Sequence, residues 1–479
     1  MTTLSLRPIS MRKKCLRTLY LTHRWLGLTM GVLMLSWCLS GIVMLWRPWP
    51  TPIAGTELVG HAPLLLPPSL PMVPSLMEPG SRFQSFRLGM VGAEPVLTLF
   101  PVTGTPFAVD LRTGQTGSIL FQEASASARA YAALLGVQNA PVFDGITTDD
   151  QWVLDTPAHQ QGFERFRFPG PARLVVYVSP VTGDVVQATD KVSRAWAWVG
   201  AIPHWLYPAV LRRHPPVWKT VVIVFSGSGI FLTVTGLFIG CLCLRRRWPF
   251  SAYRHWHLVH HFFGMLFGIL ALSWITTGFL TMTPAGLFAS NKDRLDPVHV
   301  TGSISGSELQ LLLERIAAHR TTGWIDIRGV FLDGRIFLAV TDGKGHRERL
   351  DDNLTPTPLE ISTLGQSARL LTTPDSYYFN RSTHPRHFPV IRLTADNGVL
   401  FYVDAQTGAV QAAFDTPARY SRWFVYGPHD INFLPWLRTA SARLWVVFPL
   451  LSGVFILYLA GMVIGIRRFI LLWRKTRSS

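Results

Sequence analysis

Four apolar stretches constrain the fold of this chain more than any other feature of its sequence. They cover approximately residues 22–46, 217–244, 258–283 and 444–466. Each is at least as long as the roughly 20 residues that an α-helix needs to cross the hydrocarbon core of a bilayer. The long stretches between them, 47–216 and 284–443, have the mixed composition of water-soluble protein. The sequence therefore predicts an integral membrane protein with four transmembrane helices and two large segments outside the bilayer.

Basic residues flank the apolar stretches and predict how the chain is oriented. The net charge is +17, and Lys and Arg gather in the terminal segments 1–21 and 467–479 and in the connection 245–257. Because short basic flanks stay on the cytoplasmic side of a membrane, these three segments should be cytoplasmic. The two long segments should then lie outside the cytoplasm. Charge placed in this way suits lipid head groups, and we expect no nucleic-acid partner.

The first apolar stretch follows a basic start, as the apolar region of a signal peptide does. It is too long for such a region, and Arg47-Pro48-Trp49-Pro50 offers no small-residue cleavage site. We therefore expect a retained helix. All four cysteines lie in or beside apolar stretches, so no disulfide framework is expected in the soluble segments.

The first and third apolar stretches are two versions of one sequence. When they are aligned without gaps, a His, a Ser-Trp pair and several Gly and Leu residues recur, and unrelated apolar helices rarely share a His or a Ser-Trp pair. The approaches to the second and fourth stretches also match, at Pro203-His204 and Pro428-His429. The chain is therefore predicted to consist of two parallel helix–soluble segment–helix repeats, related by an axis along the membrane normal. The matched pairs are His23/His260, Gly27/Gly264, Gly31/Gly268, Leu33/Leu270, Leu35/Leu272, Ser36/Ser273, Trp37/Trp274 and Gly41/Gly278.

The two soluble segments are predicted to be α+β. Short alternating strands end in a Thr-Gly turn in FAVDLRTGQ, VYVSPVTGDV and FYVDAQTGAV, which begin at Phe107, Val176 and Phe401, and more weakly in ERLDDNLTP at Glu348. The Gly supplies a positive φ, and the Asp or Ser caps the turn. Each segment should hold two small helix-plus-hairpin units. The expected helices lie near 122–135, 307–318 and 361–371, and 51–80 should be irregular.

Histidines at the ends of the apolar stretches are the candidate ligands. Ionisable residues are rare in membrane-spanning helices and are usually functional. The repeat pairs His23 with His260 at the predicted cytoplasmic ends, and His204 with His429 on the opposite side. Imidazole is the commonest axial ligand of haem iron, and four-helix bundles bind cofactors between facing helices. Each pair is therefore predicted to hold one haem.

Two haems, one near each face of a bilayer core roughly 30 Å thick, would form an electron relay. His257 and His261, spaced i and i+4 beside His260, are alternative ligands. A simple metal site is a further alternative, without a carboxylate or Cys cluster to support it. Glycines that share a helix face with His23 or His260 would let a flat ring lie close to the backbone. These glycines are Gly27, Gly31, Gly264 and Gly268.

The His-x-x-x-Gly-x-x-x-Gly helices with a following Ser-Trp, together with the Thr-Gly hairpins between the helices, resemble the PepSY-associated transmembrane helix family over essentially the whole chain. Some members are inner-membrane reductases of ferric siderophores that contain haem b. The resemblance implies two PepSY-like periplasmic domains, a bacterial inner-membrane location and two haem b groups. It also implies electron transfer from a cytoplasmic-side donor to a ferric siderophore or another ferric chelate. Fewer than 15 residues follow the last helix, so the donor is expected to be a separate reductase or a quinol.

Two other functions fit the same sequence. One is a haem-free PepSY-type regulator that binds an envelope peptidase or another partner. The other is a haem relay to copper, a quinone or a periplasmic protein. The soluble segments also hold a candidate substrate surface, around Trp152 leading to His159 and around Tyr377-Tyr378-Phe379 leading to Arg381, His384, Arg386 and His387, although ordinary strand and loop roles explain these residues better.

Overall fold

The structure is a computed structural model that describes residues 11–117, 121–156, 161–290, 302–319, 323–332, 334–360, 367–380 and 386–477. The chain divides into two compact units, each built from separate stretches of sequence. We call the first the helical unit; it comprises Met1–Trp49, Trp196–Ala289 and Tyr420–Ser479. We call the second the sheet unit; it comprises Pro50–Ala195 and Ser290–Arg419.

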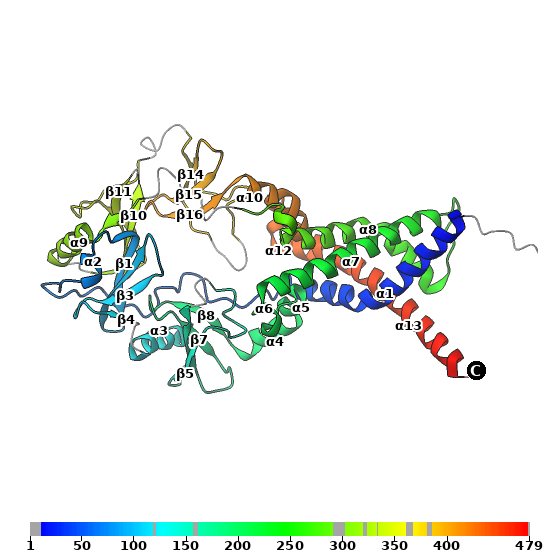
Figure 1. Ribbon diagram of the computed structural model, residues 1–479, viewed down its shortest axis with the longest axis horizontal. Coiled ribbons are helices and arrows are strands. Elements are labelled where there is room, and N and C mark those ends of the chain that lie inside the picture. The colour runs from blue at the N-terminus through cyan, green and yellow to red at the C-terminus, as the bar shows by residue number, and fades with distance from the viewer. Residues whose placement is uncertain are drawn as a thin grey trace, which may run out of the picture. The chain divides into compact units, whose positions relative to one another are not determined.

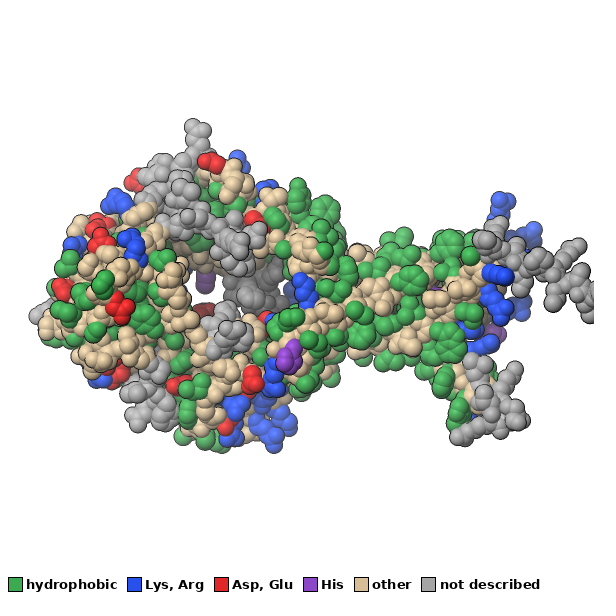
Figure 2. Space-filling model, in the orientation of Figure 1, with side chains coloured by type: hydrophobic (Ala, Val, Ile, Leu, Met, Phe, Trp, Pro, Cys, Tyr) green, Lys and Arg blue, Asp and Glu red, His purple; other side chains and the backbone are tan. Residues whose placement is uncertain are grey.

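Four long helices form the helical unit, and all four are long and apolar enough to cross a membrane. Helices α1 and α8 each pack against both α7 and α13, so the four form a bundle (Figure 1). Apolar side chains cover much of its visible surface, and Lys and Arg gather at the end where α1 begins (Figure 2). A surface of this kind requires lipid, and the chain is a membrane protein. The helices are α1 (Met11–Met44), α7 (Pro215–Leu242), α8 (His255–Thr281) and α13 (Phe448–Arg477).

Short helices lead into the long ones. Two of them, η5 and η7, are single π-helical turns, a feature common near functional sites. The segments before α7 are α4 (Lys191–Val199), α5 (Ala201–Trp205) and α6 (Ala209–Arg212), and η2 (Pro284–Gly286) follows α8. Those before α13 are α10 (Thr416–Ser421), η5 (Arg422–Tyr426), α11 (Gly427–Asp430), η6 (Pro435–Arg438), α12 (Ala440–Ala442) and η7 (Arg443–Val447).

One large antiparallel sheet joins strands from both long segments of the chain. Its order is β12-β11-β10-β1-β2-β3-β4, with β9 paired to the first two residues of β1. The β1–β10 ladder, which links the two segments, does not follow from the sequence because strand pairing over such a distance leaves no local pattern. The strands are β1 (Arg82–Val91), β2 (Glu94–Pro101), β3 (Phe107–Asp110), β4 (Thr116–Gly117), β9 (Ile304–Ser305), β10 (Trp324–Leu332), β11 (Arg335–Asp342) and β12 (Arg347–Leu350).

Two four-stranded sheets complete the sheet unit, one from each segment, in the orders β5-β6-β7-β8 and β13-β14-β15-β16. Helix α3 (Phe121–Leu134) packs on the first of them, and α9 (Gly306–Ala318) and the short α2 (Pro74–Met77) belong to the large sheet's core. The strands are β5 (Val142–Thr147), β6 (Phe163–Arg167), β7 (Val175–Val178), β8 (Val185–Thr189), β13 (Arg369–Leu371), β14 (Val390–Thr394), β15 (Leu400–Asp404) and β16 (Val410–Phe414).

The predicted Thr-Gly turns are confirmed. Gly114, Gly183 and Gly408 have φ angles of +72°, +72° and +79°. The residue that begins each turn caps it: Asp404 Oδ1, for example, accepts hydrogen bonds from the backbone N–H groups of Gln406 and Thr407, both at 2.9 Å. The weaker fourth turn is also capped by a carboxylate, because Asp351 Oδ1 accepts from the backbone N–H groups of Asn353 and Thr355, and a non-glycine residue, Leu354, has a positive φ there.

The two four-stranded sheets contain the same half-buried clasp, a carboxylate that binds an Arg and a Tyr. In the first, Asp150 accepts hydrogen bonds from Arg165 at 2.7 Å and from the Tyr177 hydroxyl at 2.9 Å. In the second, a carboxylate at the equivalent place, Asp375, accepts them from Arg392 at 3.1 Å and from Tyr402 at 2.6 Å. The clasp ties the connection between the first and second strands of each sheet to the two central strands of that sheet.

The prediction of a helix over residues 361–371 is wrong for the C-terminal part of that range. Residues 361–366 lie outside the described residues, but Arg369–Leu371 pairs with Val390–Arg392 as strand β13. A short apolar run cannot be assigned to helix or strand from periodicity alone. The other two predicted helices are present as α3 and α9, and within 51–80 the chain is irregular apart from α2. All four cysteines are free.

Glu164 on β6 is a carboxyl group buried in the sheet unit. Its side chain is 3% exposed, and its Oε2 has no hydrogen-bond partner among the described residues. Burial raises the pKa of Glu164 to about 7. Above its ordinary pKa the unfolded chain ionises while the folded chain keeps the proton. Stability should therefore fall as pH rises towards 7, by at most about 3 kcal/mol.

We predict that Glu164→Gln removes this pH dependence. The free energy of unfolding of the variant minus that of the native chain should increase as pH rises from 5 to 8, which means that the variant becomes the relatively more stable chain, as measured by denaturant unfolding in detergent. Glu308→Gln is the control, because hydrogen bonds from Ser305 lower the pKa of that carboxyl and it stays ionised throughout this range. Equal pH slopes for the native chain and Glu164→Gln would contradict the prediction.

Candidate functional site

Two pairs of facing histidines lie within the helical unit. His23 on α1 faces His260 on α8, with ring centroids 6.4 Å apart. His204 on α5 faces His429 on α11, with ring centroids 6.2 Å apart. All four rings are half-buried. The two pairs are those that the sequence repeat predicts.

Each pair is fixed to the long helices at a different level. His204 contacts Ser40 of α1 and His429 contacts Thr277 of α8. Ser40 follows His23 by 17 residues, and Thr277 follows His260 by the same number. At 1.5 Å per residue, the two pairs are about 25 Å apart along the helices. This separation is close to the thickness of a bilayer core.

Hydrogen bonds at Nδ1 orient the inner pair, His23 and His260. Nδ1 of His23 lies 3.2 Å from the carbonyl oxygen of Leu232, and Nδ1 of His260 lies 3.1 Å from that of Leu457. A carbonyl oxygen can only accept, so in both rings Nδ1 carries the proton. The lone pair of each ring is then on Nε2, where a metal can bind it.

The outer pair, His204 and His429, is held in the same way. Nδ1 of His204 lies 3.1 Å from the carbonyl oxygen of Trp37. Nδ1 of His429 lies 3.0 Å from Oγ1 of Thr277, whose hydroxyl already donates to the carbonyl of Ser273 at 2.8 Å. Thr277 Oγ1 therefore accepts from His429, and Nε2 of this ring is also unprotonated.

A glycine on the adjacent helix makes room for each ring. A Cβ at Gly236 would lie 2.7 Å from Cε1 of His23, and a Cβ at Gly461 would lie 3.0 Å from Cε1 of His260. The corresponding distances are 3.2 Å from Gly41 to His204 and 3.6 Å from Gly278 to His429. A side chain at the closest of these positions would displace the imidazole. The glycines allow the four rings to stand in the interior of the bundle.

The spacing of the rings suits a metal held between them. Two imidazoles that bind one metal ion from opposite sides, through bonds of about 2 Å, have ring centroids roughly 6 Å apart. Both observed separations agree with this value. A protonated Nδ1 that is hydrogen-bonded to a carbonyl or hydroxyl is also the usual second partner of a ligating histidine. The donor set and its surroundings therefore fit axial ligation of haem iron.

The two alternative ligands are engaged elsewhere. Nε2 of His261 lies 2.9 Å from the carbonyl oxygen of Gly240, and the ring of His257 stacks on Tyr253 at 6.1 Å. Neither is the residue that faces His23. Within the part of the chain that the structure describes, no three His, Cys, Asp or Glu side chains form a group that could hold a metal ion.

The four glycines predicted to pack against haem contact side chains of neighbouring helices. A Cβ at Gly27 would lie 3.7 Å from Leu232, and one at Gly264 would lie 3.4 Å from Leu457. Gly31 faces Met462, and a Cβ at Gly268 would lie 2.6 Å from Leu237. They let helices pack closely, and a role beside a haem stays a prediction.

Sequence reasoning missed the residues that orient and make room for the rings. These include Ser40, Thr277, Gly236 and Gly461 and the carbonyls of Leu232 and Leu457. A signal is present in the second and fourth apolar stretches, which share Leu-x-x-x-Gly-x-x-x-Gly at Leu232 and Leu457. This shared pattern places the two carbonyl oxygens, and the glycine four residues after each, at equivalent positions of the two stretches.

Three of the four aromatic residues of the candidate substrate surface are buried in the sheet unit, and Tyr377 is half-buried. Trp152, Tyr378 and Phe379 are 8%, 0% and 4% exposed. Tyr378 stacks on Tyr402 at 4.9 Å, beside the Asp375 clasp. These aromatic side chains therefore belong to the core. Arg386 covers the Tyr378 ring at 4.9 Å and His387 is exposed, whereas His159, Arg381 and His384 lie outside the described residues.

The fold and the site define a membrane protein with a four-helix unit, a separate α+β sheet unit and two half-buried histidine pairs. The model of the PepSY-associated TM region matches residues 20–310, which is more than half of the chain. The chain therefore belongs to this family, as the sequence motifs indicated. A comparison with curated proteins gives no match.

The contact between Gly236 and His23 yields a prediction that needs no cofactor. Gly236→Ala should destabilise the helical unit by about 1–3 kcal/mol, because the added methyl group overlaps the imidazole. Gly27→Ala is the matched control, since its added methyl group meets the nearest side chain at an ordinary contact distance. Thermal unfolding in detergent, followed by tryptophan fluorescence, measures both variants. Equal unfolding temperatures for the two would contradict the contact.

Proposed function

We propose that this protein is a di-haem electron relay that passes electrons across the membrane to a ferric chelate. His23 and His260 would hold one haem near the basic end of the bundle. His204 and His429 would hold the other haem near the opposite end. The observation that carries the proposal is the presence of two equivalent His–His pairs, each with a centroid separation suited to one metal between two imidazoles.

Repetition of the surroundings supports a cofactor role over chance packing. Each ring has a glycine behind it and a carbonyl or hydroxyl oxygen at Nδ1, and the partners occupy matching places in the two halves. The clasps at Asp150 and Asp375 extend the match to the sheet unit. We propose accordingly that the whole chain is two parallel repeats.

Haem iron supplies reversible one-electron transfer, and the protein contributes the position and surroundings of that iron. The residues of this chain would hold the iron at two levels, keep each imidazole in the ligating tautomer and exclude water from the bundle. The basic ends of the helices favour a cytoplasmic location for the inner pair. The outer pair and the sheet unit would then face the periplasm of a bacterial inner membrane, where the acceptor is available. The donor would be a separate reductase or a quinol.

Single substitutions should remove the haems one at a time. We predict that His23→Ala or His260→Ala lowers the haem content from two per chain to one, and that His204→Ala or His429→Ala does so independently. Combining one change from each pair should leave none. The control is His214→Ala, an exposed histidine of the same unit. Haem is counted by pyridine haemochrome absorbance of the purified variants. Undiminished haem in the double variant would exclude these ligands.

The activity is tested by adding a ferric chelate to the dithionite-reduced protein without oxygen. The reduced haem spectrum should disappear and ferrous iron should accumulate in a ferrous-specific trap. The matching gallium(III) chelate, which cannot be reduced under these conditions, should leave the spectrum unchanged. Reduced protein that persists with every ferric chelate, yet is oxidised by a quinone or a copper(II) salt, would favour the other relay functions.

A further inference from the structure

A cleft of about 800 Å³ with a mixed polar and apolar lining opens in the sheet unit beside the ladder that joins β1 to β10. Pockets for organic ligands fall in the range of about 300–1,000 Å³, so the cleft can take more than an inorganic ion. Its lining combines hydroxyl and amide groups with an apolar wall at Phe100 and Val102 and with charged residues. The polar groups include Gln84, Ser85, Thr182 and Ser303.

Two arginines meet at the base of this cleft. Arg87 of β1 and Arg328 of β10 are direct partners across the antiparallel ladder, so their side chains project from the same face of the sheet. Each lies four residues before the end of its strand. Two like charges at such positions repel each other unless carboxylates lie between them. Asp326 provides this bridge, because it accepts from Nε of Arg87 at 2.5 Å and from Nε of Arg328 at 2.7 Å.

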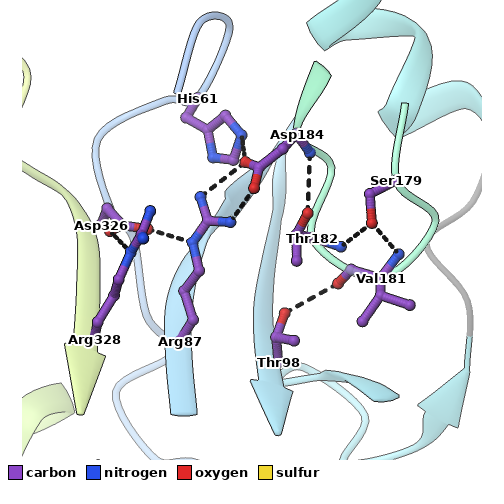
Figure 3. A network of polar contacts seen from close by, with 9 residues as sticks. All are labelled: His61, Arg87, Thr98, Ser179, Val181, Thr182, Asp184, Asp326 and Arg328. Atoms are coloured by element: carbon purple, nitrogen blue, oxygen red, sulfur yellow. Dashed lines mark hydrogen bonds and ion pairs between the residues drawn. The ribbon is translucent and has the colours of Figure 1, made fainter. Parts of the chain in front are cut away.

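Arg87 is completely engaged within the protein (Figure 3). Its Nη1 and Nη2 donate to the two carboxylate oxygens of Asp184, at 2.5 Å and 2.9 Å. His61 lies 3.4 Å from the same carboxylate. Burial alone would favour the neutral acid, but the charge and hydrogen bonds of Arg87, together with His61, hold the pKa of Asp184 well below its ordinary range. Asp184 therefore lines the cleft as a carboxylate that Arg87 already neutralises.

Arg328 differs from Arg87 in having no second carboxylate among the described residues. The second carboxylate of Arg87, Asp184, ends the turn that begins at Ser179. The corresponding turn in the other four-stranded sheet begins at Asp404, and the residue that ends it is Ala409, which has no carboxylate. Only Nε of Arg328 has a partner within the described part of the chain, so the N–H groups on its two terminal nitrogens are uncommitted. Its side chain is 51% exposed at the cleft, with the hydroxyls of Ser303 and Thr182 among the other lining groups.

We infer that this cleft binds an organic carboxylate through Arg328. A guanidinium with two free terminal nitrogens matches the two oxygens of a carboxylate in a bidentate fork. The hydroxyl and amide groups would bind further polar atoms of the ligand, and Phe100 and Val102 would contact its carbon skeleton. The identification of this ligand as a carboxylate chelator of ferric iron rests on the proposed function. The binding of a carboxylate does not.

The test is calorimetric titration of the detergent-purified full chain with citrate and with its gallium(III) complex. Gallium(III) is not reduced in this titration, so the measurement is independent of haem. Saturable binding is expected. Arg328→Ala should weaken it roughly ten- to hundredfold. Arg328→Lys, which keeps the charge but loses the fork, should weaken it less. Arg335→Ala, an exposed arginine of the same sheet outside the cleft, should bind as the native chain does.

Absence of saturable citrate binding by the native chain at millimolar concentrations would overturn the inference. So would equal affinities of the native chain and Arg328→Ala, provided that their unfolding temperatures agree. In that case ferric-chelate reduction by the haem-loaded protein would still test the proposed function separately. Conversely, citrate binding by a native chain that purifies without haem from haem-sufficient cells would support the cleft and contradict the relay.

Discussion

The histidine rings in this structure depend on one constraint, the need to satisfy imidazole nitrogens inside an apolar helix bundle. A polar group that loses water without gaining a hydrogen bond destabilises the fold. Here each Nδ1 meets a carbonyl or a hydroxyl oxygen of a neighbouring helix, which fixes the tautomer and the direction of the ring. Because the hydrogen bond at Nδ1 fixes the ring, it also fixes the direction in which Nε2 points. The geometry of each pair follows, because the rings can turn little without breaking these bonds.

Glycines allow the imidazole rings to be held in this way while the helices stay closely packed, because a glycine lets another group come close to the helix backbone. Glycines at 41, 236, 278 and 461 leave the space that the rings occupy, while Gly31 and Gly268 admit Met462 and Leu237 between helices. The same chain thus uses glycine in two ways, to seat imidazoles and to draw helices together. Only the first use bears directly on the proposed relay. The sheet unit has a different basis, in which charge pairs such as Arg87 with Asp184 and Asp326 connect strands that are distant in sequence.

Local patterns in the sequence predict the features that depend on local requirements. Apolar length identifies the four helices that are long and apolar enough to cross a membrane, and the shared His and Ser-Trp positions pair His23 with His260, whose rings face each other in the structure. The Thr-Gly turns are predicted correctly because positive φ and an Asp or Ser cap are local requirements. Three features are not predictable in this way: the β1–β10 ladder, the Arg87–Asp184–Asp326 network and the carbonyls that orient the histidines. They depend on contacts between residues far apart in the chain, and a backbone carbonyl has no signature in the sequence.

The most direct measurement is the number of haem groups bound by the native chain. Protein purified in detergent from haem-sufficient cells should show sharp reduced α and Soret bands after addition of dithionite. Pyridine haemochrome absorbance should give two haem b per chain, one for each histidine pair. A colourless protein would contradict the relay. It would leave the histidine pairs as packing elements of a membrane protein whose sheet unit binds a partner.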